Sequence, residues 1–320
     1  MEIIPGIDHL NRPFVNPVVT LGNFDGVHLG HQKIFTKIKE EAARVDGEAV
    51  VITFEPHPLK VLSPDRCPPL LTPFRQKMGL IEASGIDTVL CIQFTRAFSQ
   101  MSPLAFIQNV LIEKVAAKKI IVGYNYHFGR NKGGNVETLR TVGRSFHVDV
   151  DVMEPLILDG IVVSSSKIRT LIKAGDVETA AKLLGRDYSI IGNVVEGAKR
   201  GHRLLGFPTA NLAISEEVVP KTGVYAVEVL WNRQPFNGVA NLGVNPTFQP
   251  AHSETKAKVS LEVYILDFNH NIYGDEIQVS FKKRIRAEVR FGSTADLIDQ
   301  IQRDVQWAQQ NVFMKKGVRD

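Results

Sequence analysis

The amino-acid sequence predicts a chain of α/β + β class, in which a parallel sheet covered by helices is followed by an antiparallel barrel or sandwich with a final helix. Three observations support this. Short β-branched runs alternate with helical patterns through residues 18–186, strands follow one another without intervening helices from residue 189, and a capped amphipathic segment comes last. Alternating strands and helices are typical of parallel sheets, whereas consecutive strands joined by Gly, Pro and Asn turns are typical of antiparallel ones.

The first half of the chain carries five apolar, β-branched runs that predict the strands of the parallel sheet. They cover residues 18–21, 48–54, 88–94, 119–124 and 148–153. Helical patterns occupy three of the segments between them, at residues 31–45, 73–85 and 102–115. In the second of these segments Gly85 stands where a helix is expected to stop.

The second half of the chain begins with two expected short helices, which end near Gly175 and Gly185. Strands are then expected over residues 189–195, 223–230, 234–243, 258–268 and 276–286. The final segment, 293–313, opens with a Ser/Thr cap and has three apolar residues on one helical face, Leu297, Ile301 and Val305. The change of pattern places the domain boundary near residue 186, with domains 1–186 and 187–320.

The composition is that of an ordinary globular protein of two domains, with 320 residues, 44% of them hydrophobic and 22% charged. The net charge of +4 is spread along the chain, with 22 Lys and Arg against 19 Asp and Glu over residues 1–186 and 16 against 15 over the rest. Nucleic-acid binders concentrate basic residues in a stripe or tail. The nearest candidate, "FKKRIR" at 281–286, alternates as the solvated face of a strand does, so nucleic acid is not an expected partner.

Cysteine usage and hydropathy exclude several further classes. Cys67 and Cys91 belong to no metal-binding pattern, so neither a structural zinc nor a disulfide scaffold is expected. The N-terminal "MEIIPGIDHL" lacks the apolar segment of a signal peptide, and no run approaches the roughly 18–20 apolar residues of a membrane span. We therefore expect a cytoplasmic protein without membrane contact, and the oligomeric state stays open.

The stretch "GNFDGVHLGH" at 22–31 joins the first predicted strand to the first predicted helix. The first N–H groups of a helix lack partners, and glycines let a backbone approach a ligand closely, so phosphate fits such a turn. His28 and His31 would add donors that stabilise charge on a phosphoryl group. Taken alone, the pattern fits a phosphate site and a polar turn equally well.

Three further polar segments shift that balance toward a site. "FEPHP" at 54–58 and "GYNYHFGRNKGG" at 123–134 follow two other predicted strands, and "SSSKIR" at 164–169 precedes a helix. Each has a plain structural interpretation, such as a histidine packed between prolines or serines that cap a helix. Ligands of open α/β sheets bind outside the carboxyl ends of the strands, so we expect the strand-end loops to face one crevice.

The second domain has its most specific stretch at 197–212, "GAKRGHRLLGFPTANL". Its basic residues among glycines suit a polyphosphate, and the oxygens of Thr209 and Asn211 suit Mg²⁺, which prefers oxygen ligands. The alternative is a hairpin in which Thr and Asn only cap the turn. The residues alone leave both interpretations open.

These motifs together resemble one family. "GNFDGVHLGH" is similar to the His-x-Gly-His signature of the nucleotidyltransferase superfamily, and "SSSKIR" resembles its Ser/Thr-rich second motif. With "FEPHP", "GYNYHFG" and "GFPTAN", the likeness over essentially the whole chain is to bacterial bifunctional riboflavin kinase/FAD synthetases. It implies an N-terminal Rossmann-like FMN adenylyltransferase domain and a C-terminal antiparallel β-barrel of riboflavin kinase type.

For the first domain, the resemblance implies that the phosphate of FMN attacks the α-phosphorus of ATP, with His28 and His31 on the ATP phosphates. It assigns binding of ATP and FMN to Gly22, Phe24, Gly30, Phe54, His57, Asn125, Ser164, Ser165 and Arg169. Family members often have Ser-Ser-Thr where this chain has three serines, so a hydroxyl remains available.

For the second domain, the resemblance implies that Thr209 and Asn211 bind Mg-ATP and that Glu262 is the general base. The ATP site would include Lys199, Arg203, Gly206, Pro208, Thr209 and Asn211. Arg284 and Arg290 are candidates for binding flavin, with exposed strand charges as the alternative. The family often has Arg where this chain has Asn245.

The sequence thus predicts an enzyme that converts riboflavin to FMN and FMN to FAD, with ATP as co-substrate and Mg²⁺ as cofactor at both sites. A second hypothesis is a nucleotidyltransferase that acts on another phosphorylated acceptor, with the barrel as an accessory domain. A third is a flavin- or nucleotide-binding regulatory protein without turnover.

Overall fold

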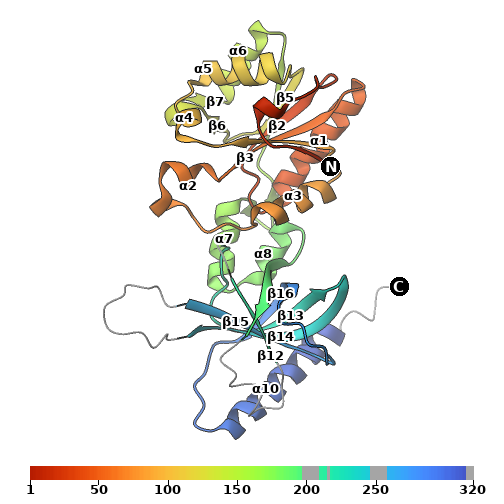
Figure 1. The fold of residues 1–320 in the computed structure, drawn as a ribbon, viewed down its shortest axis with the longest axis vertical. Helices are drawn as coiled ribbons and strands as arrows, with labels where there is room; N and C mark the ends of the chain where they lie inside the picture. The colour runs from red at the N-terminus through yellow and green to blue at the C-terminus, as the bar shows by residue number, and fades with distance from the viewer. Residues whose placement is uncertain (197–208, 215–216, 246–257, 315–320) are drawn as a thin grey trace. The chain divides into compact units, whose positions relative to one another are not determined.

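The computed structural model describes residues 1–196, 209–214, 217–245 and 258–314 and divides into two compact units, Met1–Ser165 and Ser166–Asp320 (Figure 1). The first unit is built on a six-stranded sheet covered by helices, and the second on a closed six-stranded barrel with a C-terminal helix. The predicted fold class is confirmed, with a barrel rather than a sandwich.

The sheet of the first unit is parallel throughout. Its order is β1-β4-β3-β2-β5-β8, and the strands are β1 (Glu2–Ile4), β2 (Val18–Leu21), β3 (Ala49–Glu55), β4 (Thr88–Gln93), β5 (Lys119–Gly123) and β8 (Asp149–Met153). The five predicted strands are confirmed to within one residue at each end, and β1 was not expected. Because the chain steps outward from β2 to β4 and then crosses to β5, the carboxyl ends of β2, β3 and β5 are neighbours at the point where the strand order reverses.

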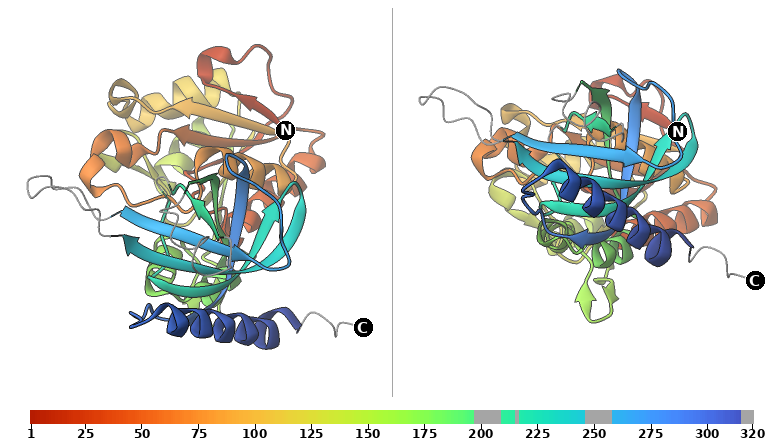
Figure 2. Two further views of the ribbon diagram at one scale, coloured as in Figure 1. Left: turned by 60° about the horizontal axis from the view of Figure 1, so that its bottom comes forward. Right: turned by 90° about the horizontal axis from the view of Figure 1, so that it is seen from below.

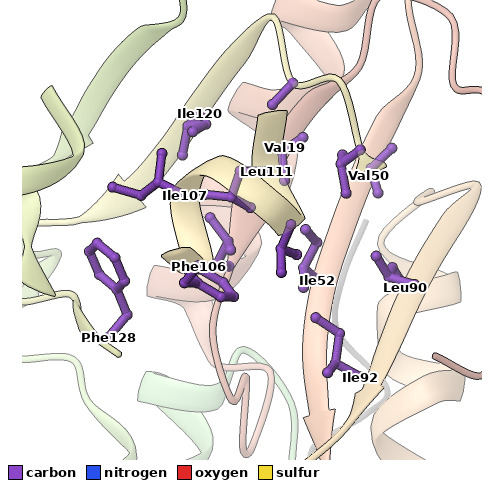
Figure 3. Close-up of a cluster of buried hydrophobic side chains, with 14 of the residues drawn as sticks. Val19, Val50, Ile52, Leu90, Ile92, Phe106, Ile107, Leu111, Ile120 and Phe128 are labelled. Carbon is purple, nitrogen blue, oxygen red and sulfur yellow. The ribbon is translucent and has the colours of Figure 1, made fainter. Parts of the chain in front are cut away.

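Alternate residues of the strands contribute to two cores, one on each face of the sheet. On one face Val18 and Val51 pack with residues of α1 (Leu29–Arg44) and α3 (Phe74–Ala83). On the other face Val19 and Ile52 pack against Phe106, Ile107 and Leu111 (Figure 3). Both faces of the sheet are therefore covered, as continuous apolar strands require.

The helices of the first unit agree in part with the sequence. The predicted helices over 31–45 and 73–85 are α1 and α3, and Gly85 follows α3 with the positive φ of +74° that a helix stop needs. The segment expected over 102–115 is α5 (Pro103–Ala105) continued by the π-type helix η3 (Phe106–Lys114). Helix α6 (Val136–Ser145) was not predicted. The shorter elements are η1 (Ile7–His9), α2 (Pro58–Leu62), η2 (Pro64–Arg66), α4 (Arg96–Ser99), β6 (His127–Phe128), η4 (Arg130–Lys132), β7 (Gly134–Asn135), β9 (Ile157–Leu158) and β10 (Ile161–Val162).

Two short helices precede the barrel, α7 (Ser165–Ala174) and α8 (Val177–Leu184). They end before Gly175 and Gly185, whose φ angles are +84° and +75°, so both predicted helix stops are confirmed. Helix α8 packs against barrel strands β11 (Tyr188–Val195) and β16 (Glu276–Arg286). These contacts place α8 in the second compact unit.

The barrel closes in the antiparallel order β11-β12-β15-β14-β13-β16. Its other strands are β12 (Thr209–Leu212), β13 (Gly223–Trp231), β14 (Gln234–Asn245) and β15 (Lys258–Ile265). Tyr225, Leu261 and Phe281 are fully buried inside it. The five predicted strands of this half are confirmed, and the short β12 is additional.

The C-terminal helix α10 (Thr294–Ala308) lies along the outside of the barrel (Figure 2) and runs on into the π-type helix η5 (Gln309–Phe313). Its N-cap Ser293 accepts a hydrogen bond from the Asp296 N–H at 3.1 Å, as the capped pattern predicts. Of the predicted apolar face, Val305 packs against the barrel, and Leu297 and Ile301 are half-buried. The fully buried positions of α10 are Asp304 and Ala308.

The basic run at 281–286 is a strand, as predicted, and its basic side chains are half-buried, three of them in ion pairs. Lys282 pairs with Asp187 at 2.6 Å, and Lys283 pairs with Glu178 of α8 at 3.0 Å. The Arg286 guanidinium binds both carboxylate oxygens of Asp304 at 2.7–3.0 Å. These ion pairs connect β16 to helix α8, to the segment before β11 and to helix α10.

Candidate active sites

The two histidines of the glycine-rich motif stand together at the N-terminus of α1. His28 is the N-cap, and its Nδ1 accepts a hydrogen bond from the His31 N–H at 3.3 Å. The two imidazoles stack with their centroids 3.5 Å apart, and the Phe24 ring meets His31 edge-on at 5.2 Å. A Cβ on Gly30 would lie only 3.2 Å from the His28 ring, so glycine allows this close approach. The stack is therefore fixed where the helix dipole favours an anion.

Burial sets the charge of His31. It lowers the pKa of His31 well below its usual range, and the nearby His28 lowers it further. Nδ1 of His31 is buried and has no hydrogen-bond partner within the described part of the chain. His31 is consequently a neutral imidazole at physiological pH. Its open nitrogen is the kind of buried polar group that a bound ligand can satisfy.

The motif's loop is held by backbone far away in the sequence. The buried Asp25 carboxylate accepts hydrogen bonds from the N–H of Leu71 at 2.9 and 3.0 Å and from the N–H of Thr72 at 3.0 Å. Gly26 donates to Thr72 Oγ1 at 3.0 Å and has a φ of +87°. The Ser165 hydroxyl donates to the Asp25 carbonyl at 2.8 Å. The second predicted motif therefore meets the first at this loop, through Ser165.

A pocket opens beside the loop, at the ends of β2 and β3. It is small, with a cavity volume of about 10 Å³, and is lined by Asn23, Asp25, Glu55, His57, Leu70, Thr72, Phe74 and Lys77. His57 is the N-cap of α2, and its Nε2 lies 3.5 Å from the Asn23 side-chain nitrogen. Phe54 is not among these lining residues, and its ring packs with Phe94 and Phe98. Two of the predicted strand-end loops thus share one hollow.

The other predicted residues of this site have simpler surroundings. Asn125 is exposed just beyond β5, and its carbonyl lies 2.9 Å from Nδ1 of His127. A Cβ on Gly22 would lie 3.0 Å from the Phe24 ring. Ser164 is half-buried before α7, and Arg169 is a buried residue of α7.

The predicted residues of the second unit form a polar row across three neighbouring strands of the barrel. Glu262 of β15 stands opposite Asn211 of β12 on one side and opposite Asn241 of β14 on the other. Thr209 lies two residues before Asn211 on the same face of β12. Their neighbours Ala210, Leu212, Leu261 and Val263 are buried inside the barrel, so the polar row faces outward. Burial nevertheless raises the pKa of the Glu262 carboxyl.

Several predicted residues stand outside this row. Lys199, Arg203, Gly206 and Pro208 lie outside the described residues. Arg284 donates from Nη2 to the Thr222 carbonyl at 2.8 Å and packs against Gly175 and Gly223, whereas Arg290 is exposed. Asn245, where the family often has Arg, is the last residue of β14, opposite Lys258.

Sequence reasoning missed Asn23, Lys77 and Asn241. Asn23 lies inside the histidine motif, and Asn241 is the first residue of the segment "NLGVNPTF". Both therefore belong to segments already singled out in the sequence. Their places depend on contacts and strand pairing that no local pattern reveals. Lys77 carries no sequence signal, because a lysine in an amphipathic helix normally faces solvent.

Two protein families match the chain, one for each unit. The FAD synthetase family matches residues 12–167, and the riboflavin kinase family matches residues 184–312. In the described part of the chain no helix is long and apolar enough to span a membrane.

Whole-length relatives combine both parts. The bifunctional riboflavin kinase/FMN adenylyltransferase of Buchnera aphidicola from Acyrthosiphon pisum is 37% identical over 306 residues, which are 95% of this chain and 96% of that protein. The protein of the same name from Escherichia coli K12 has the same identity and coverage. A crystal structure titled as a macrolide-efflux protein from Streptococcus pneumoniae has a TM-score of 0.86 and 32% identity, over 97% of this chain and 98% of that one.

Proposed function

The chain belongs to the bifunctional riboflavin kinase/FMN adenylyltransferase family, and from that premise we propose which of its residues serve each reaction. The enzyme phosphorylates riboflavin to FMN with ATP and then transfers AMP from a second ATP to FMN, which gives FAD and pyrophosphate. We assign the adenylyl transfer to residues 1–186 and the kinase reaction to residues 187–320.

The stacked His28–His31 pair carries the assignment of the first reaction. An oxygen of the FMN phosphate attacks the α-phosphorus of ATP, and the bond from that phosphorus to the bridging oxygen of pyrophosphate breaks. The two imidazoles bind the ATP phosphates and stabilise the charge that develops on them, together with the N-terminus of α1. Preorganisation supports this role, because the rings are already fixed by each other and by Phe24.

The surrounding residues take supporting roles in this proposal. Gly22 and Gly30 allow the backbone to approach the phosphates, and Ser165 holds the loop through the Asp25 carbonyl. The remaining candidates, which contact either nucleotide or flavin, are Phe24, Phe54, His57, Asn125, Ser164 and Arg169.

Glu262 is the proposed general base of the kinase reaction. It accepts the proton of the riboflavin 5′-hydroxyl as that oxygen attacks the γ-phosphorus of ATP, and ADP leaves. Burial raises the pKa of the carboxyl, which brings it nearer to the operating pH and strengthens it as a base. Thr209 and Asn211 lie beside it on the next strand, where they contact the ATP.

The donor set around Glu262 fits Mg²⁺. Thr209 and Asn211 supply oxygens from one face of β12, and the Glu262 carboxylate stands opposite Asn211. Oxygen donors of this kind suit a hard cation that keeps waters and shares its sphere with phosphates. When bound, Mg²⁺ would neutralise charge on the ATP phosphates, and we propose Thr209 and Asn211 as its protein ligands.

A flavin time course tests both assignments. Purified protein is incubated with riboflavin or FMN, ATP and Mg²⁺, and the flavins are separated by chromatography. His28→Ala is expected to accumulate FMN without FAD, whereas Glu262→Ala is expected to make FAD from supplied FMN but no FMN from riboflavin. Loss of both reactions in either folded variant would contradict the two-site assignment.

A further inference from the structure

We propose that Lys77 is a positioning residue of the adenylyltransferase site. Its buried ammonium fixes the position of the histidine loop, residues 22–31, relative to the loop after β3. The inference rests on the proposed function of the first unit. Lys77 is a cation in the wall of the pocket, and neither of the two proposed reactions uses it.

The side chain reaches from α3 to the ends of two strands. Lys77 is 6% exposed, and its Nζ lies 3.4 Å from the Asn23 carbonyl, just after β2. The same nitrogen lies 3.3 Å from Thr53 Oγ1 and 3.5 Å from the Phe54 carbonyl, at the end of β3. One ammonium thus donates to both loops that frame the pocket.

The charge of Lys77 is poorly compensated. None of the ion pairs in the described ranges includes it, its three hydrogen-bond partners are neutral oxygens, and its Nζ lies 5.7 Å from the centroid of the Phe74 ring. Burial lowers its pKa, while Glu55, Cys91 and Asp25 act in the opposite direction. Burying an ammonium on neutral oxygens costs free energy that an apolar side chain of similar length would avoid. Core stability alone therefore gives no reason for a lysine here.

The ammonium links the two loops that carry His28 and His57. The Asn23 carbonyl belongs to the loop that carries His28, and the Phe54 carbonyl belongs to the segment that leads to His57. Asn23 and His57 also approach each other at 3.5 Å. Without Lys77 the two loops would be joined by the Thr53 hydroxyl, which donates to the Asn23 carbonyl at 3.4 Å, and by the Asn23–His57 approach. A displacement of about 1 Å at a reacting centre can lower a rate by about 100-fold.

Lys77→Met tests the proposal in the whole protein, because FMN formation by the second unit reports folding in the same sample. We expect the kcat of FAD formation to fall at least about 10-fold, with the KM for ATP changed less and FMN formation within about twofold of wild type. The matched control is Lys39→Met, which removes another ammonium bonded to the region of α3, on the Ser84 carbonyl at 2.6 Å, remote from the pocket lining. It is expected to leave FAD formation unchanged.

A pH profile separates positioning by charge from simple packing. The groups that face Lys77 are Glu55, Asp25, Cys91 and His57. In wild type we expect the kcat of FAD formation to fall at alkaline pH, as the ammonium loses its proton. This fall should be absent in Lys77→Met and in Lys77→Arg, which keeps a permanent charge and more activity than Met. It should persist in Cys91→Ala, which removes the other alkaline group.

The outcomes distinguish this inference from the proposed function. If His28→Ala leaves FAD formation intact, the function assigned to the first unit is wrong. If His28→Ala abolishes it while Lys77→Met keeps its kcat within twofold, or keeps the alkaline fall of wild type, Lys77 has no positioning role. Loss of FAD formation in Lys77→Met with partial recovery in Lys77→Arg supports it.

Discussion

His28 and His31 stack with their ring centroids 3.5 Å apart, and the second ring has a buried nitrogen without a partner within the described residues. Two imidazoles at this distance cannot both carry a charge at low cost. The burial that lowers the pKa of His31 keeps that ring neutral, so its open nitrogen can take part in a hydrogen bond without bringing a positive charge. In the proposed site, His31 would therefore contribute a hydrogen bond to the phosphate rather than a positive charge.

His31→Phe should separate the chemistry of this ring from its packing. Phe preserves an aromatic ring beside His28 and Phe24 but removes both nitrogens. We expect the kcat of FAD formation to fall about 100-fold, as when one transition-state donor is lost. Thermal stability should not decrease, because an unpartnered buried nitrogen disappears. Steady-state kinetics and thermal unfolding measure both, and a wild-type rate of FAD formation would exclude the proposed role.

Gly26→Ala should lower the free energy of unfolding by more than the strain of a positive φ alone would. A Cβ on Gly26 would lie 2.7 Å from Leu71 Cδ1, and the φ is +87°. Gly160→Ala is the matched control, because Gly160 has a φ of +75° with open space around its Cβ position. We expect the control to lose roughly 1 kcal/mol of stability and Gly26→Ala to lose at least about 1 kcal/mol more. Only Gly26→Ala should slow FAD formation; equal effects in urea unfolding and in rate would argue against this packing.

The pH dependence of FMN formation should report Glu262. Burial raises the pKa of this carboxyl above that of an exposed glutamate. The carboxyl accepts a proton only in its ionised form, so kcat/KM should fall as the pH drops through that raised pKa and level off above it. The midpoint is thus expected above pH 4.5. Glu262→Gln should remove the acidic limb and most of the activity, and a variant that kept both would point to another base.

Asp304→Ala should destabilise the second unit, mainly because it leaves the charge of Arg286 without its partner and less because it creates a cavity. The Asp304 side chain is 4% exposed and binds Arg286, whose side chain is 21% exposed. Removing one partner of a buried pair leaves the other uncompensated, so we expect a loss of about 3 kcal/mol. Asp299→Ala breaks the exposed pair with Arg303 on the same helix and should cost less than about 1 kcal/mol. Urea unfolding followed by tryptophan fluorescence compares the two, and similar losses would refute the argument.

Local patterns predicted the parts of the fold that local physics decides. Apolar β-branched runs marked the strands, and Gly85, Gly175 and Gly185 marked helix ends because their backbone needs a positive φ. The four residues of β12 gave no such signal. They form a strand because Thr209 and Asn211 pair with Tyr264 and Glu262, far away in the chain.

The same distinction explains the site. The histidine motif is contiguous, so its residues could be singled out from the sequence. Lys77 could not, because its role depends on the packing of α3 beneath two strand ends. The ion pairs of the basic run at 281–286 were not predicted for a related reason: alternation does not reveal partners such as Asp187 and Asp304, which come from other segments.

The closed barrel also sets an order of events during synthesis. Its first strand, β11, pairs with its last strand, β16, and Tyr188 stands opposite Phe281. The barrel can therefore close only after Phe281 has left the ribosome. The sheet of the first unit needs no residue beyond β8. A nascent chain can therefore complete its adenylyltransferase sheet while the kinase strands are still an open ribbon with unpaired edges. In that interval β11 and β13 both lack β16, the neighbour with which each of them pairs.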